Sequence, residues 1–279
     1  MRKVIVGVII AAVAVVLIVG AVVYIGYLPF LRQETVEYDD SLTLMMGGGG
    51  NSVVLAADDG SRVLVIDTKM GKAARKLHAT IRERYPDAEI VVVNTHLHSD
   101  HTGGNKLFDG ARFIAGAYTD EQWQEWTGGA PLPDDRIEPD AGVVTRIGDE
   151  FVEIRNMGQG HTWQDVIVYL HERKMLVTGD LLFHGLHPAM FPEVGTDGNR
   201  WIAALEALLD DYPADTVVPG HGPLTGRGTL ERMRAYFVDI RDAAGDPARL
   251  GEVKKRYGSL RPIPGMSGFA KTRSFFATK

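Results

Sequence analysis

The hydrophobic positions of this chain fall into short apolar runs separated by segments with helical spacing. SVVLAADDGSRVLVIDT predicts two strands around an Asp-Asp-Gly turn, and AEIVVVN (88–94) is a continuous run typical of a buried strand. Between them, GKAARKLHATIRERY (71–85) spaces its alanine, leucine and isoleucine residues along one face of a helix. ARFIAG and YTDEQWQEW predict a further strand and helix, and a small helix is expected near Gly103–Gly104.

The same alternation returns in the second half. DVIVYLHERKMLVTGD predicts a hairpin, and GNRWIAALEALLDDY (198–212) is a strongly amphipathic helix. ADTVVPGHG predicts a strand that runs into a loop, and TLERMRAYFVDIRDAA predicts a helix. Two similar halves of this kind favour an α/β fold in which two β-rich layers are covered by helices. The basic tail from Gly251 gives no assignable element.

The amino-terminal segment has a different pattern. Residues 4–26 carry no charge, and about 20 apolar residues suffice to cross a bilayer as a helix. A cleaved signal peptide has a shorter apolar region, roughly 7–15 residues, before its cleavage site. We therefore expect an uncleaved signal-anchor transmembrane helix within residues 1–30, a linker over 31–50 that ends in GGGG, and one domain over 51–279. Cleavage of the helix would instead give a secreted protein.

Charge sets the expected orientation of that helix. Arg2 and Lys3 precede it, and acidic residues follow it. Positive residues stay on the cytoplasmic side of a membrane, so the domain is expected to be membrane-anchored and extracytoplasmic, in a periplasm or on an outer surface. Without Arg2 and Lys3 the formal charge of −6 becomes −8, which disfavours a nucleic-acid partner. The chain has no cysteine, which excludes disulfides and thiolate ligands.

One polar stretch, NTHLHSDHTGGN, is unusual because it holds three of the nine histidines beside a carboxylate. His96 and His98 alternate on an extended segment, so their rings can project to the same side. Asp100 and His101 follow where the chain turns. The stretch is either a solvated loop or a metal site. A single tetrahedral ion cannot easily use all four groups, whereas two neighbouring ions can if further ligands arrive from elsewhere.

Three other segments offer such ligands after an apolar strand or in a glycine-rich loop. They are His161 in GQGHTW, Asp180 in LVTGD and His221 in VVPGHGP. Each segment alone is typical of an ordinary loop, but their combination with the histidine stretch favours metal binding. His78 and His171 lie outside these motifs and are expected to be structural or surface residues.

Together, THLHSDHTGGN, GHT, TGD and PGHGP resemble the metallo-β-lactamase superfamily of metal-dependent hydrolases, over about residues 50–245. The resemblance implies a four-layer αβ/βα sandwich with two metal ions at one edge. The ions would be Zn²⁺, with iron or manganese as alternatives. The resemblance also implies a ligand set, in which the first ion takes His96, His98 and His161, the second takes Asp100, His101 and His221, and Asp180 bridges both with a water or hydroxide.

Asp180 also bears on the reaction that the resemblance implies. β-Lactamases of the superfamily typically carry cysteine or serine there, whereas hydroxyacylglutathione hydrolases, lactonases and phosphodiesterase-like members carry aspartate. The resemblance therefore implies hydrolysis of an ester, lactone, thioester or related bond in a small molecule by a hydroxide activated between two zinc ions. Asp100 would accept or orient the proton of the water. Asp67 would support a ligand from behind, or else be a turn or cap residue. The proline and glycine common after GHT are Trp163 and Gln164 here.

Other functions stay open. β-Lactam hydrolysis suits an external location, and a metal-binding module without catalysis is a different class of function. A diiron redox protein is a further class, although no flavin module is visible after residue 245. The long stretch after Asp180 is expected to be irregular, and its side chains either flank a substrate pocket or pack the loop; they are His184, His187, Met190 and Phe191. Trp123 and Trp126 form either an apolar rim or a packed helix face.

Overall fold

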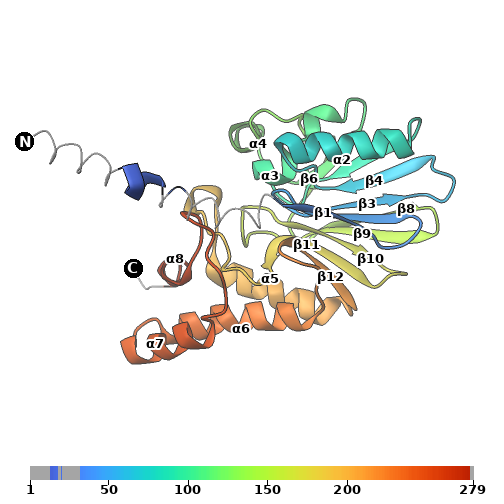
Figure 1. The fold of residues 1–279 in the computed structure, drawn as a ribbon. Coiled ribbons are helices and arrows are strands. Elements are labelled where there is room, and N and C mark those ends of the chain that lie inside the picture. The colour runs from blue at the N-terminus through green and yellow to red at the C-terminus, as the bar shows by residue number, and fades with distance from the viewer. Residues whose placement is uncertain (1–12, 18–19, 21–31, 277–279) are drawn as a thin grey trace, which may run out of the picture.

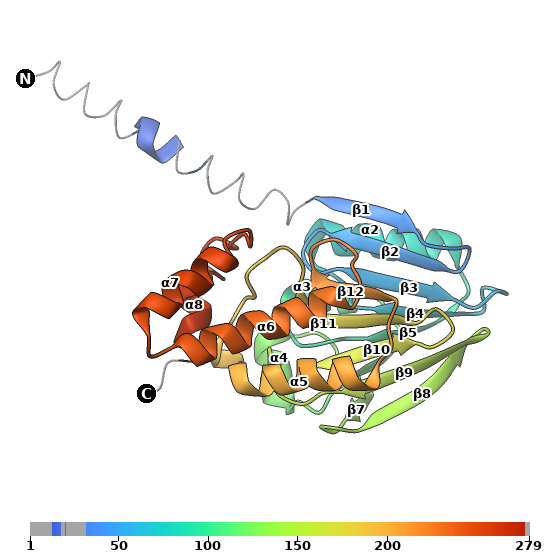
Figure 2. The same ribbon diagram turned by 90° about the horizontal axis from the view of Figure 1, so that it is seen from below.

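Two β-sheets lie face to face, with helices on their outer sides (Figure 1). The computed structural model describes residues 13–17, 20 and 32–276. Helix α2 covers the first sheet, while α5 and α6 cover the second, which gives the helix–sheet–sheet–helix order expected from the sequence (Figures 1 and 2).

The first sheet has seven strands in the order β1 to β7. β1 to β4 pair antiparallel, and β4 to β7 pair parallel through helical connections. The elements of this half are β1 (Gln33–Glu37), β2 (Leu42–Gly47), β3 (Ser52–Ala56), β4 (Arg62–Ile66), α2 (Gly71–Arg84), β5 (Glu89–Val93), α3 (Ser99–Thr102), η1 (Asn105–Leu107), β6 (Arg112–Gly116), α4 (Asp120–Thr127) and β7 (Asp135–Ile137).

The second sheet has five strands in the order β12-β11-β10-β9-β8. β11 and β12 are parallel neighbours joined through α5, and the other pairs are antiparallel. The elements of this half are β8 (Gly142–Ile147), β9 (Glu150–Asn156), β10 (Val166–Leu170), β11 (Met175–Phe183), η2 (Pro192–Val194), α5 (Gly198–Asp211), β12 (Thr216–His221), α6 (Gly228–Ala243), α7 (Pro247–Arg256) and α8 (Phe269–Ser274).

The core forms because the central strands, such as β3, β10 and β11, are buried on both faces. One cluster fills the space between the sheets, including Leu64 and Val168, and others lie beneath α2 and beneath α5 and α6. α5 shows how the sequence sets this packing. Asp197 accepts hydrogen bonds from the free amides of its first turn, and the helix then buries Trp201 and Leu205, one turn apart.

Most predicted elements are confirmed, including the helices over 71–85 and 198–212 and the strand over 88–94. The linker predicted over residues 31–50 is wrong in its extent, because β1 and β2 belong to the first sheet and are held there by strand pairing and a buried β2. The small helix expected near Gly103–Gly104 instead begins at Ser99, with η1 following it. β8 and β9 were not predicted, and the carboxyl end of β11 takes the first part of the stretch expected to be irregular.

The transmembrane helix predicted over residues 1–30 lies almost entirely outside the described residues. Within the part of the chain that is described, no helix combines the length and apolar character that a membrane crossing requires. The domain boundaries other than the linker stay a prediction.

Candidate metal centre

The histidine stretch forms the first wall of the site. It leaves the end of β5, and His98 occupies the amino-terminal cap position of α3, whose four residues carry Asp100 and His101. The turn is fixed from behind, because the backbone carbonyl of His101 accepts hydrogen bonds from the amide of Thr68 (2.7 Å) and from Asn94 Nδ2 (3.1 Å). The ligand candidates therefore start from a rigid backbone.

The second sheet supplies the remaining candidates. His161 lies in the loop between β9 and β10, Asp180 lies within β11, and His221 ends β12. The carboxylate of Asp165 holds the His161 loop by accepting the amides of His161 (2.7 Å) and Thr162 (3.1 Å). Burial raises the pKa of Asp165 to about 6, against the opposing effects of His161 and the hydrogen bonds. The site thus lies where loops and strand ends of both sheets meet.

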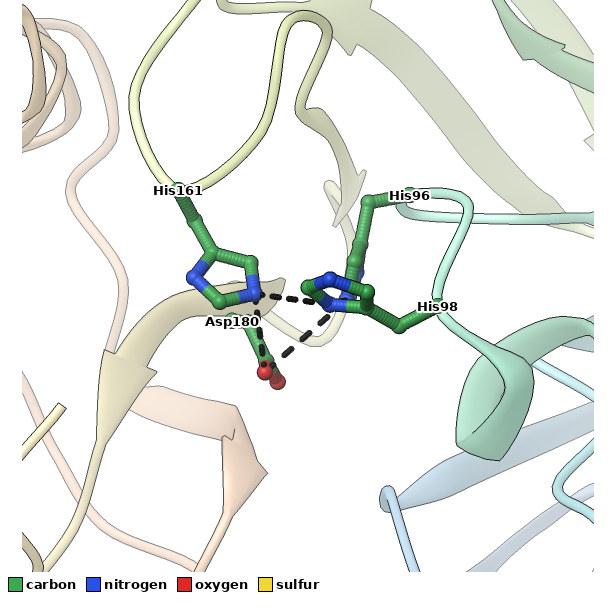
Figure 3. A group of neighbouring side chains, drawn as sticks. All are labelled: His96, His98, His161 and Asp180. Carbon is green, nitrogen blue, oxygen red and sulfur yellow. Dashed lines mark hydrogen bonds and ion pairs between the residues drawn. The ribbon is translucent and has the colours of Figure 1, made fainter. Parts of the chain in front are cut away.

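Four of the predicted residues form one group, drawn in Figure 3: His96, His98, His161 and Asp180. His98 Nδ1 lies 3.0 Å from the Nε2 atoms of both His96 and His161. Asp180 Oδ2 lies 3.2 Å from His161 Nε2 and 3.8 Å from His96 Nε2. Each residue turns one ring nitrogen or carboxylate oxygen toward a common centre (Figure 3).

The other three form a second group: Asp100, His101 and His221. Asp100 Oδ2 lies 3.3 Å from His221 Nε2 and 3.8 Å from His101 Nε2. The second oxygen of Asp180 faces this group, with Oδ1 3.2 Å from His101 Nε2 and 3.3 Å from His221 Nε2. The carboxylate of Asp180 therefore touches both groups, one oxygen to each.

Asp67 supports the second group from outside. It is buried and its Oδ2 lies 2.7 Å from His101 Nδ1, while the amide and hydroxyl of Thr95 donate to its two oxygens at 2.8 and 2.7 Å. A carboxylate behind a histidine ring fixes which ring nitrogen faces forward. With Nδ1 held by Asp67, His101 presents Nε2 to the centre.

The electrostatics of the site fit bound cations. Burial lowers the pKa of His98 to about 3 and that of His96 well below its usual range, so both rings are neutral and free to coordinate. Burial acts to raise the pKa of Asp180, but His221, His101 and His96 hold it well below its usual range. His101 behaves in the opposite way: burial acts to lower its pKa, and the carboxylates of Asp67, Asp180 and Asp100 raise it well above its usual range.

Two buried atoms at the centre, His101 Nε2 and Asp180 Oδ1, face each other at 3.2 Å, but neither makes a hydrogen bond of good geometry. Buried polar atoms without a partner are costly, and a metal ion between them would satisfy both. Imidazole and carboxylate donors suit zinc, manganese or iron. The residues present therefore fit one metal ion in each group.

The other residues proposed from the sequence divide between the site and the core. Phe191 flanks the site, and the centre of its ring lies 5.1 Å from that of His98. On the Phe191 ring, Lys271 Nζ lies 4.7 Å from the ring centre. His187 instead points away and hydrogen-bonds the hydroxyl of Tyr236, and Met190 is buried in the core beneath α5 and α6. His184 bonds the backbone carbonyl of Pro223.

The tryptophans of α4 have a packing role. Trp123 is fully buried and its indole donates to the carbonyl of Pro131. Trp126 is half-buried and packs against the hydrophobic cluster that contains Trp123. Sequence reasoning missed three features that border the site: the fully buried Lys69, the glycines at 47–50 and Asn51. The run of four glycines is the available signal, but the sequence pattern alone predicts that it ends a linker.

Comparison with known proteins agrees with this geometry. A family profile, the metallo-beta-lactamase superfamily, matches residues 45–221. The chain is 27% identical to the metallo-beta-lactamase type 2 of Bacillus cereus over 171 residues, which span 60% of this chain and 65% of that enzyme. It is 30% identical to the hydroxyacylglutathione hydrolase of Polaromonas sp. (strain JS666) over 203 residues, spanning 66% and 72%. Among solved structures, a metallo-beta-lactamase from Pontibacter korlensis shares the fold, with a TM-score of 0.65 and 22% identity over 75% of this chain and all of that one.

Proposed function

The chain belongs to the metallo-beta-lactamase superfamily, and on that basis we propose that it is a hydrolase that works with two metal ions. The observation that carries the proposal is the position of Asp180, whose two carboxylate oxygens face two separate groups of ligand candidates. A carboxylate shared in this way is the arrangement that two neighbouring ions need.

The residues would divide as the two groups do. His96, His98 and His161 would hold the first ion, Asp100, His101 and His221 would hold the second, and Asp180 would contribute to both. Zinc is the leading candidate, with iron or manganese as alternatives. Bound ions of this kind activate a water molecule as a nucleophile near neutral pH and stabilise the charge that develops on the oxygen of the bond being cleaved.

The protein's own residues would orient the reactants. His98 and Asp100 are the half-buried members of the cluster, so substrate and water approach on their side. We propose that Asp100 holds or accepts the proton of the attacking water, since it is the carboxylate that solvent reaches. Phe191 lies against His98 and forms an apolar wall on that side.

The proposed substrates are small molecules with an ester, lactone, thioester or related bond. The bridging aspartate and the similarity to a hydroxyacylglutathione hydrolase support this choice. β-Lactam hydrolysis is the second candidate, because relatives and solved neighbours carry the name metallo-beta-lactamase.

Metal content of the purified full-length protein is the first test. We expect about two equivalents of metal per chain in the wild type and a loss in His98→Ala and Asp180→Ala. His171→Ala is the matched control, because its ring lies away from the cluster and contacts Glu153. Wild-type metal content in both site variants would refute the ligand assignment.

An assay panel is the second test, with metal-loaded protein and four substrates: a lactone, a thioester, a phosphodiester and a chromogenic cephalosporin. Turnover of the lactone or thioester that disappears in Asp180→Ala supports the proposal. Faster turnover of the cephalosporin would put β-lactam hydrolysis first. Complete inactivity of protein that holds its metal would instead favour a binding module.

We also propose that the domain lies outside the cytoplasm, anchored through residues 1–30. The support is the uncharged segment 4–26 with Arg2 and Lys3 before it. Protease treatment of intact cells and of spheroplasts tests it. Digestion of the domain only after lysis of the inner membrane would contradict this location.

A further inference from the structure

A loop of four glycines lies directly against the second group of ligand candidates. A β-carbon on Gly50 would lie 2.5 Å from Cε1 of His101, and one on Gly49 would lie 3.0 Å from Cβ of Asp100. Gly47, Gly48 and Gly49 all have positive φ angles, between 70° and 99°. Only glycine combines this backbone shape with so close an approach, so the loop acts as a wall that limits where Asp100 and His101 can lie.

Two buried polar side chains hold this glycine loop in place. The ammonium of Lys69 donates to the carbonyls of Gly47 (2.7 Å) and Gly50 (2.5 Å). Asn51 accepts the amide of Gly47 (2.7 Å) and donates to the carbonyls of Pro219 (2.8 Å) and Gly222 (2.9 Å), on either side of His221. The glycine loop therefore connects α3, which carries two ligand candidates of the second group, to the end of β12, which carries the third.

Holding the loop with Lys69 costs free energy, because the side chain is a buried cation on a strained backbone, and this indicates a function. Its side chain is fully buried, and a buried ammonium loses its hydration. Its backbone has a φ of 61°, a conformation that residues other than glycine rarely adopt. Burial also lowers its pKa to about 7, although Asp67 and Asp100 act in the opposite direction. An apolar side chain would fill the space without the free-energy cost of a buried charge, but it could not donate hydrogen bonds to the carbonyls of Gly47 and Gly50.

We propose that Lys69 is a positioning residue for the second metal ion: by holding the glycine loop against Asp100 and His101, it fixes the geometry of the second ligand group without being a ligand. This inference rests on the proposed function, because it takes the second group as a metal site. The close approaches of the loop are to Asp100 and His101, so the first group is expected to keep its affinity.

The test is a metal titration that resolves the two sites. Metal-free full-length wild type, Lys69→Met and Lys69→Gln are titrated with Co²⁺, followed by visible absorption and by the amount retained after dialysis. Lys76→Met is the matched control, since Lys76 is an exposed lysine of α2. We expect Lys69→Met to bind one equivalent as tightly as wild type and the other about 10-fold to 100-fold more weakly. Lys69→Gln, which keeps amide donors without the charge, is expected to recover part of the loss.

A second variant tests the same contact without changing Lys69. Gly50→Ala places a β-carbon against the His101 ring at a residue outside the left-handed region, so it is expected to weaken the same single equivalent. This variant also keeps the inference testable if Lys69→Met does not fold.

The possible results separate the two proposals. Equal loss of affinity at both sites, or wild-type binding in both Lys69→Met and Gly50→Ala, would overturn the positioning role of Lys69. Neither result would contradict the proposed metal centre itself. Tighter binding in both Lys69→Met and Lys69→Gln would also overturn it, because the charge alone would then govern affinity. A wild type that binds no metal would instead remove the proposed function, and the role of Lys69 with it.

Discussion

Gly220 gives a sharp test of where the Asp180 carboxylate lies. Its backbone is outside the left-handed region, so alanine meets no conformational penalty there. A β-carbon at this position, however, would lie 2.0 Å from Asp180 Oδ1 and 2.7 Å from the carbonyl carbon of Gly179, where real β-carbons essentially never come within 3.0 Å. In Gly220→Ala the carboxylate must therefore retreat by about 1 Å or the strands must separate, because the core cannot absorb the added volume.

The size of the effect follows from this collision. Overpacking of a buried site costs about 1–3 kcal/mol of unfolding free energy. A misplacement of about 1 Å in an active site costs on the order of 100-fold in rate, or roughly 2.7 kcal/mol of activation free energy. Because Asp180 faces both ligand groups, the displacement is expected to weaken both metal equivalents.

Gly251→Ala is the matched control for this substitution. Gly251 lies within α7 with no heavy atom within 4 Å of an added β-carbon, so alanine there is expected to stabilise the helix by up to about 1 kcal/mol. The assay compares metal content after dialysis, hydrolysis rate and urea unfolding of the metal-free proteins. If Gly220→Ala keeps the metal content and rate of Gly251→Ala, Asp180 does not point into the centre, and the bridging role fails.

Three further predictions concern the surroundings of the site. Asp67→Asn places an amide where His101 Nδ1 now meets a carboxylate, so competition with a chromophoric chelator should show about 10-fold to 100-fold weaker binding of one equivalent; unchanged affinity would contradict the supporting role of Asp67. In metal-free protein, the unfolding free energy should rise above pH 7 by up to about 1.4 kcal/mol per pH unit, because folded Lys69 loses its proton near pH 7 while lysine in the unfolded chain keeps its proton up to about pH 10.4. Urea unfolding at several pH values should show this slope in the wild type and not in Lys69→Met, and an equal slope in both proteins would refute this origin. Removing the metal with a chelator should lower Tm, since metal at 100 times its Kd stabilises by about 2.7 kcal/mol, or roughly 5–10 °C for a domain of this size; calorimetry that shows no shift would argue against a bound ion.

How far the sequence predicts this protein depends on how local each signal is. His96, His98 and His101 lie within six consecutive residues, so their convergence needs little knowledge of the fold. The continuous apolar runs of β5 and β10 are typical of buried strands and can be recognised without knowledge of the fold. β1 is different, because it is a five-residue edge strand with exposed positions, and only its pairing with β2 makes it a strand.

Lys69 shows a second limit of sequence reasoning. Lysine is almost never fully buried, so a lysine that follows a strand is expected to be a surface residue. Its burial becomes visible only when the glycine loop is in place, because the two partners of its ammonium are backbone carbonyls and leave no signature in the side chains. Features held together by backbone groups from distant segments are therefore the ones that sequence reasoning misses.

The position of Asp180 combines both kinds of information. TGD after an apolar strand marks the residue, but a regular strand would alternate its side chains and would not fix where this one points. The pairing of β11 with β12 shifts register on both sides of Gly179, which has a φ of 53° and whose added β-carbon would lie 2.5 Å from the side chain of Thr95. An irregularity of this kind bends a strand and redirects the next side chain. The bridging position of Asp180 therefore depends on the glycine before it, which is free to turn, and on Gly220 across the pair, which leaves the carboxylate its space.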